Sequence, residues 1–169
     1  EVLDNDPEDV AAIGALDRIF THTEKWPELV ENLRRQVAIT GDEHDLIALY
    51  FRMGQTYQVQ MNESAKAIEA YREILNIDPA HEQTLQALEL IFTSGEHQSE
   101  SAEILEPIYQ AAERWDALVK LGEVKLGATE DQHERLAINQ NVAEICEHRL
   151  GSPGDAYIWW LRAYIDDPS

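Results

Sequence analysis

The chain has 169 residues, of which 33 are Asp or Glu and 13 are Lys or Arg, so its formal net charge is −20. Nucleic-acid affinity comes largely from Lys and Arg side chains that neutralise phosphates. This charge therefore argues against a nucleic-acid partner and favours a neutral or basic protein or peptide. The sequence contains no apolar run of about 18 residues, the length that could insert in a membrane. Cys146 is its single cysteine, which excludes an internal disulfide. We expect an acidic, folded protein of a reducing compartment, the cytoplasm.

Internal repetition is the main organising feature of the sequence. A short phrase that ends in Asp-Pro recurs three times, at residues 3–7, 75–79 and 164–168. The helical pattern of residues 15–21 returns 72 residues further on, and the segment that begins at Trp26 returns 89 residues further on, at Trp115. Self-similarity at a fixed spacing is typical of stacked repeat arrays. The sequence therefore predicts an all-α, right-handed α-solenoid of stacked antiparallel helix pairs, with about nine helices.

Apolar residues three and four apart predict helices in nearly every segment between turn signals. The first helix is expected over residues 7–22, with Asp6 as its N-cap. Its predicted buried stripe consists of Val10, Ile13, Leu16, Ile19 and Phe20. The second helix begins near Trp26 and stops at Gly41, the third follows Asp42, and the fourth covers residues 63–76.

The third and fourth helices resemble one tetratricopeptide repeat (TPR), a helix-turn-helix of about 34 residues. The residues that carry this resemblance are Tyr50, Met53, Gly54, Tyr57, Ala67, Tyr71 and Pro79. Gly54 and Ala67 are small, which lets the two helix backbones approach, and the aromatic rings fill the space beside this contact. We predict that the side chains of Tyr50, Met53, Tyr57, Ala67, Tyr71 and Leu75 are largely buried.

A degenerate second copy lies 89 residues further on, at Asn139, Val142, Ala143, Cys146, Ala156, Trp160 and Pro168. The spacings of 72 and 89 residues differ by 17, about one helix and a turn, which indicates one extra, unpaired helix. We expect Gly95 to separate two helices derived from the same pattern, with Phe92 and Tyr109 in similar environments. The predicted organisation is a single TPR-like domain, 1–169, with helix pairs at 7–41, 42–79, 101–130 and 131–168 and the extra helix at 80–100.

The last predicted helix, residues 154–165, is apolar over most of its circumference. Because the terminal repeat of an array needs a polar outer face, we expect this chain to be a piece of a longer array. We also expect Trp159 or Trp160 to be exposed or to contact another copy of the chain. For Trp26 and Trp115 we favour a structural role, packing against the preceding helix, over a ligand-binding one.

The sequence contains few candidate catalytic or metal-binding motifs. No phosphate-binding loop or nucleophile elbow occurs, and His133-Glu134 lacks the second histidine of a zinc motif. Glu144 and His148 lie four residues apart and could share a metal, but no further ligands accompany them, so an ion pair is the favoured interpretation. Cys146 is expected to be a buried small side chain. We predict no enzyme activity, no metal and no cofactor.

The TPR resemblance implies a scaffold that binds a peptide or protein on the concave face of the array. The candidate partner-binding residues are Arg52, Gln55, Gln58, Asn141 and Glu144. They include one cation, which argues against a clamp for a C-terminal carboxylate. The alternative function is a structural subunit of a larger assembly, self-associating through its open ends.

Overall fold

The computed structural model describes residues 10–166, and this part of the chain is all-α, with nine α-helices and no strand. In chain order the elements are α2 (Val10–His22), α3 (Trp26–Ile39), α4 (Glu43–Gln55), a π-helical turn η1 (Thr56–Gln60), α5 (Ser64–Ile77), α6 (Glu82–Ser94), α7 (Gln98–Ala111), α8 (Trp115–Ala128), α9 (Gln132–His148) and α10 (Pro153–Asp166). The predicted fold class and number of helices are confirmed. Asp6 lies outside the described residues.

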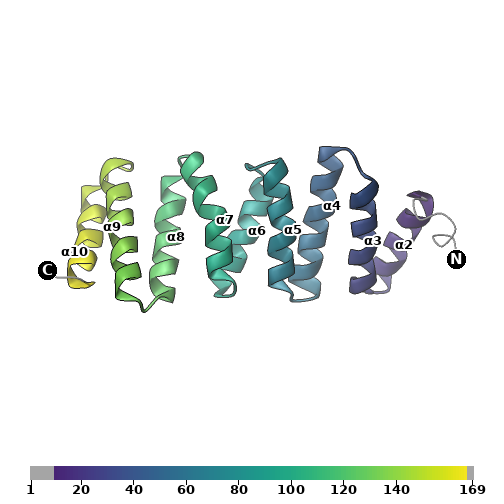
Figure 1. Cartoon of the computed structure of the whole chain (residues 1–169), viewed down its shortest axis with the longest axis horizontal. Helices are drawn as coiled ribbons and strands as arrows, with labels where there is room; N and C mark the ends of the chain where they lie inside the picture. Colours follow the sequence, from purple (N-terminus) through teal and green to yellow (C-terminus); the bar gives the residue numbers. More distant parts are fainter. Residues whose placement is uncertain (1–9, 167–169) are drawn as a thin grey trace. The chain divides into compact units, whose positions relative to one another are not determined.

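The chain divides into two compact units, residues 1–88 and 89–169, with the boundary inside α6. Within the first unit, α2, α3, α4 and α5 pack in sequence order and alternate in direction (Figure 1). Within the second, α7, α8, α9 and α10 do the same. Each helix thus buries its apolar side against neighbours in sequence. The right-handed sense of a superhelix and the predicted division into repeats stay predictions.

The turn between the first two helices is the same in both units. Glu24, before α3, and Glu113, before α8, each have a φ of 54° and lie 89 residues apart. The following amides donate to matched carbonyls, Lys25 N to Phe20 O at 2.9 Å and Arg114 N to Tyr109 O at 2.8 Å. The 89-residue repeat is therefore present in backbone conformation.

The turn between the last two helices repeats in the same way. Asn62 has a φ of 53°, and Gly151, 89 residues later, has a φ of 60°. The hydrogen bonds around them correspond pair by pair: Met61 N to Thr56 O (3.1 Å) with Leu150 N to Ile145 O (3.0 Å), and Glu63 N to Tyr57 O with Ser152 N to Cys146 O (both 2.8 Å). α2–α5 and α7–α10 are thus two versions of one four-helix arrangement, and α6 is the helix outside it.

Gly95 separates α6 from α7, as predicted. α6 ends at Ser94, and Gly95 and His97 have φ values of 91° and 49° before α7 begins at Gln98. A positive φ of 91° is accessible mainly to glycine. Phe92 and Tyr109 are both buried, which agrees with similar environments; the duplication itself stays a prediction.

The α4–α5 contact has the predicted packing. A Cβ atom built on Gly54 would lie 2.7 Å from Cδ1 and 2.8 Å from Cζ of Tyr71, so only glycine leaves room for this ring. Five of the six side chains predicted to be buried are buried; Tyr50 is half-buried. Burial and, secondarily, the nearby Glu73 carboxylate raise the pKa of Tyr50, consistent with a ring that packs inward while its hydroxyl stays near the surface.

The predicted stripe of α2 is only partly right. Ile13 is buried and Leu16 and Phe20 are half-buried, but Ile19 is 52% exposed. α2 packs mainly on α3, so one side of its apolar surface is covered, and the other has no cover within residues 10–166. Asn32 of α3, which the sequence did not single out, is buried and donates from Nδ2 to the Ile13 carbonyl at 2.9 Å. The side chain of Val10 is outside the described part.

Candidate protein-binding grooves

The five candidate partner-binding residues fall in both units. Arg52 and Gln55 lie on α4 and Gln58 in η1, whereas Asn141 and Glu144 lie on α9. Gln58 accepts a hydrogen bond from the Tyr71 hydroxyl at 2.8 Å, so its side-chain oxygen is already bound to a residue of the core. Gln55 is exposed.

Arg52 is occupied inside the first unit. Its Nη1 lies 2.6 Å from Asp17 Oδ2, and its Nη2 donates to Thr21 Oγ1 at 2.9 Å. The guanidinium therefore spans from α4 to two positions one turn apart on α2. The surrounding depression has a volume of about 680 Å³. Arg52 contributes to holding α2 and α4 together.

Asn141 and Glu144 line a groove in the second unit. We call it the α7–α9 groove; it has a volume of about 400 Å³ and is lined by Glu106, Gln110, Trp115, Leu118, Asn141, Glu144, Ile145, His148 and Arg149. The α7 residues are four apart and the α9 residues follow a spacing of three and four, so each set lies on one helix face. The sequence analysis singled out two residues on the α9 side of this groove and none on its α7 side; that either side binds a partner stays a prediction.

The side chains of the α7–α9 groove differ in how they are engaged. Glu106 Oε1 lies 2.7 Å from Lys125 Nζ, and the Arg149 guanidinium lies 4.9 Å from the centre of the Trp115 ring. Within residues 10–166, by contrast, Gln110, Asn141 and Glu144 form no side-chain hydrogen bond or ion pair. One carboxylate and two amides of this groove are therefore available to a ligand.

A second groove, the α6–α8 groove, lies on the opposite side of α8. It has a volume of about 450 Å³ and is lined by Glu89, Phe92, Thr93, Tyr109, Arg114, Asp116, Ala117, Lys120, Leu121 and Val124. Its base is apolar, and its polar groups are largely engaged: the Tyr109 hydroxyl donates to the Glu89 carboxylate, and the Arg114 guanidinium lies 4.9 Å from the centre of the Tyr109 ring.

The sequence also raised a metal site and a reactive thiol as alternatives, and the structure describes the residues of both. No three His, Cys, Asp or Glu side chains within residues 10–166 converge on a point where a metal could bind, and Glu144 and His148 are without further ligands. Cys146 is buried. Burial, followed by the nearby carboxylates Asp155, Asp116 and Glu123, raises the pKa of its thiol. A protonated, enclosed thiol is a poor nucleophile.

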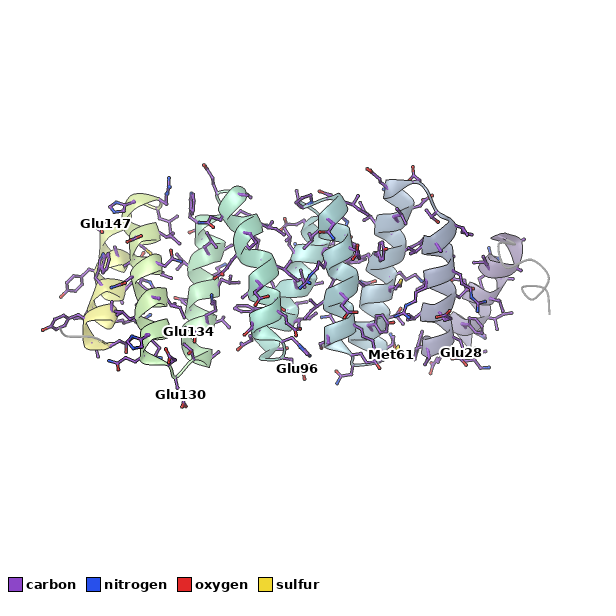
Figure 2. The ribbon with its side chains drawn as sticks, viewed as in Figure 1. Glu28, Met61, Glu96, Glu130, Glu134 and Glu147 are labelled. Atoms are coloured by element: carbon purple, nitrogen blue, oxygen red, sulfur yellow. The ribbon has the colours of Figure 1, made fainter. Side chains whose placement is uncertain are left out.

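The tryptophans take different environments. Trp26 and Trp115 are half-buried at the starts of α3 and α8. Trp159 is buried, whereas Trp160 is 38% exposed and donates from Nε1 to Glu147 Oε2 at 3.2 Å. Glu147 lies on α9 beside α10 (Figure 2). Trp160 is therefore the more exposed of the two adjacent tryptophans, and its contact with another copy of the chain stays a prediction.

Among the helices of residues 10–166, none has the length and apolar character that a membrane span requires.

No protein-family model matches the chain, and no curated protein matches it. Among solved structures, the chain is similar to two crystal structures of MamA. The first is 16% identical with a TM-score of 0.39 and covers 99% of this chain and 83% of that chain. The second is 11% identical with a TM-score of 0.42 and covers 94% and 91%. Both likenesses are distant, and the assignment of the fold rests on the helices of this chain itself.

Proposed function

We propose that this chain is a non-enzymatic protein-interaction scaffold whose α7–α9 groove binds a basic segment of a protein partner. The groove is built from side chains on three consecutive helices, which gives a ligand a preformed surface. The acidic composition of the chain, with a net charge of −20, attracts basic partners over a range of about a Debye length, ~8 Å at physiological salt.

The observation that carries this proposal is the difference between the two units at matched positions. Shifted by 89 residues, Asp17 and Arg52 of the first unit correspond to Glu106 and Asn141 of the second. In the first unit the Arg52 guanidinium binds the carboxylate of Asp17. In the second unit the carboxylate is retained in Glu106, but a short amide replaces the arginine, and the space between α7 and α9 is a groove.

Arg52 thus shows, inside the first unit, how a basic side chain is bound in this arrangement. In the second unit the basic side chain would come from the partner. Glu106 is partly neutralised by Lys125, whereas Asp17 accepts a hydrogen bond from the uncharged Gln36 amide at the matched position, at 3.5 Å. Glu144 adds a second carboxylate where the first unit has the neutral Gln55. The groove lining therefore holds two carboxylates and the Arg149 guanidinium, and Glu144 is the carboxylate without an ion-pair partner in the described part of the chain, which a Lys or Arg side chain could pair with.

The test uses a short fluorescein-labelled peptide in which Lys and Arg alternate with Gly and Ser, with fluorescence anisotropy as the readout. The peptide should bind the unmodified chain, and binding should weaken as salt rises. Asn141→Arg should weaken binding at least about tenfold, because the new guanidinium fills the groove as Arg52 does, and loss of a charge-assisted hydrogen bond is worth ~1.5–3 kcal/mol. Glu144→Lys should have a similar effect.

Glu69→Lys is the matched control. Glu69 is exposed in the middle of α5, as Glu144 is in the middle of α9, and the substitution changes the net charge by the same amount. If Glu69→Lys weakens binding as much as Glu144→Lys does, the peptide responds to overall charge and the groove is not its site. Equal binding by the Asn141→Arg variant would also contradict the proposal.

A further inference from the structure

The outer side of α10 is an apolar surface without cover in the described part of the chain. Ala156, Trp159 and Ala163 are the buried side chains of α10, and the helix packs against α9. The remaining large apolar residues, which we call the α10 face, are between 38% and 69% exposed: Tyr157, Ile158, Trp160, Leu161, Tyr164 and Ile165. Side chains project from the side of α10 that faces away from α9 (Figure 2).

The inner part of the α10 face, formed by Tyr157, Trp160 and Tyr164, corresponds to buried residues in the first unit. The residues 89 positions before Tyr157, Trp160 and Tyr164 are Ile68, Tyr71 and Leu75 of α5, and all three of these are buried. The register of this comparison is supported by a shared hydrogen bond. Tyr71 donates to Gln58, and Trp160 donates to Glu147, the residue 89 positions after Gln58.

The outer part of the α10 face differs from its counterpart. Ile158, Leu161 and Ile165 occupy the positions of Glu69, Arg72 and Asn76, which are polar and exposed in α5. At solvent-exposed positions of the same four-helix arrangement, α10 therefore carries three large aliphatic side chains where α5 carries polar ones. A face with this composition is suited to contact with another apolar surface.

The size and charge of the α10 face fit a second copy of the same helix. From the exposed fractions and about 200 Å² for a large side chain, the face presents roughly 600 Å². Two such faces would bury roughly 1,200 Å², the lower limit for a specific interface. Among its 14 residues α10 carries three charged ones, Asp155, Asp166 and Arg162, so α10 itself adds little to the repulsion between two highly acidic chains.

We propose that this chain self-associates through the α10 face, with α10 of one copy packed antiparallel on α10 of the other about a two-fold axis. The stripe formed by Tyr157, Trp160, Leu161 and Tyr164 has a symmetric spacing of three, one and three residues. A two-fold axis between Trp160 and Leu161 therefore brings these two residues of both copies together around the axis, and it places Tyr157 against the partner's Tyr164. Such an isologous contact closes on itself as a dimer.

The test is sedimentation velocity of the full chain over a range of concentrations. Because the estimated interface lies at the lower size limit, where weak and transient contacts are common, we expect a dissociation constant of roughly 1–100 μM. Because the two copies repel each other and the contact is apolar, dimerisation should strengthen as salt rises. This direction is opposite to that expected for the basic peptide in the α7–α9 groove, so failure of one proposal can be told from failure of the other.

Leu161→Arg is the variant that decides the proposal. Leu161 is 45% exposed, and the matched position of α5 is naturally an arginine, Arg72. The substitution should therefore leave the helicity measured by circular dichroism unchanged. It should weaken dimerisation at least about tenfold, because two guanidinium groups would meet at the two-fold axis. Tyr164→Arg is a second variant with the same expected effect.

Leu90→Arg is the control, because Leu90 is also an exposed leucine (66%) but lies on α6. It should leave the dissociation constant unchanged. A chain that stays monomeric at several hundred micromolar would overturn the proposal and assign the α10 face to a different occupant. A dimer that Leu90→Arg disrupts and Leu161→Arg does not would overturn it as well.

Discussion

Gly54→Ala isolates the contact that sets the distance between α4 and α5. A Cβ atom at this position would lie 2.7 Å and 2.8 Å from two ring atoms of Tyr71 and closer still to a third, whereas ordinary van der Waals contacts begin at 3.4 Å. Tyr71 is fully buried and its hydroxyl is hydrogen-bonded to Gln58. Since the ring cannot swing away, the two helices must separate by part of an ångström.

Overpacking of this kind costs about 1–3 kcal/mol. Replacing a helical glycine by alanine also has a favourable part, about 1 kcal/mol from helix propensity. Gly14→Ala measures this favourable part alone, because nothing lies within 4 Å of a Cβ atom on Gly14 in α2. The difference in unfolding free energy between the two variants, about 1–3 kcal/mol, therefore reports the cost of the contact with Tyr71.

The assay is urea unfolding followed by circular dichroism at matched protein concentration. Gly14→Ala should raise the midpoint and Gly54→Ala should lower it. In the Tyr71→Leu background the ring is absent, so Gly54→Ala should lose most of its cost, whereas Tyr71→Phe keeps the ring and should leave that cost in place. If Gly54→Ala is as stable as Gly14→Ala, the close approach of the two helices is not limited by this ring.

Two further measurements examine the second unit. Gly122→Ala should destabilise it by about 1–2 kcal/mol relative to Gly127→Ala, because a Cβ atom on Gly122 would overlap a methyl group of Val142, whereas one on Gly127 meets nothing within 4 Å; thermal unfolding would show the difference, and equal midpoints would contradict it. The folded-state pKa of Cys146 is raised, mainly by burial, so the folded chain holds the thiol proton more tightly than the unfolded chain, and stability should fall as pH rises past the ordinary thiol pKa of about 8.5. Cys146→Ala should remove this part of the pH dependence, and a thiol reagent should modify Cys146 only as fast as the chain unfolds.

The regular part of the fold could be predicted because it depends on local signals. The 89-residue spacing read from the two tryptophan segments is matched by equal backbone turns at Glu24 and Glu113, and the stop at Gly95 follows from its positive φ. The π-helical turn η1 was not predicted. It lies within a continuous helical pattern, where a single widened turn leaves the apolar spacing almost unchanged.

The side-chain contacts between distant segments could not be read from the sequence. Arg52 was assigned to partner binding as an inward-facing residue of the repeat, but it pairs with Asp17, which is 35 residues away on α2. Ile19 was assigned to the core because of its spacing, which gives the helix face but not whether a neighbour covers that face. Asn141 and Glu144 were predicted together and lie together in one groove, but the residues opposite them on α7 depend on packing.

The two four-helix versions differ at the two surfaces for which we propose partners. Where the first unit has Asp17 and Arg52 bound to each other, the second has an acidic groove, and where α5 has polar exposed residues, α10 has aliphatic ones. In the first unit these positions are paired or polar, whereas in the second they offer a partner an unpaired carboxylate in the groove and exposed apolar area on α10.

Because the groove lies on α7–α9 and the apolar face on α10, one copy of the chain could hold a basic segment and a second copy at the same time, and a dimer would present two grooves. A partner with two basic segments should then bind the dimer more tightly than the Leu161→Arg monomer, by the gain that comes from linking two sites. Equal affinity of such a bivalent peptide for both forms would show that the two surfaces act independently.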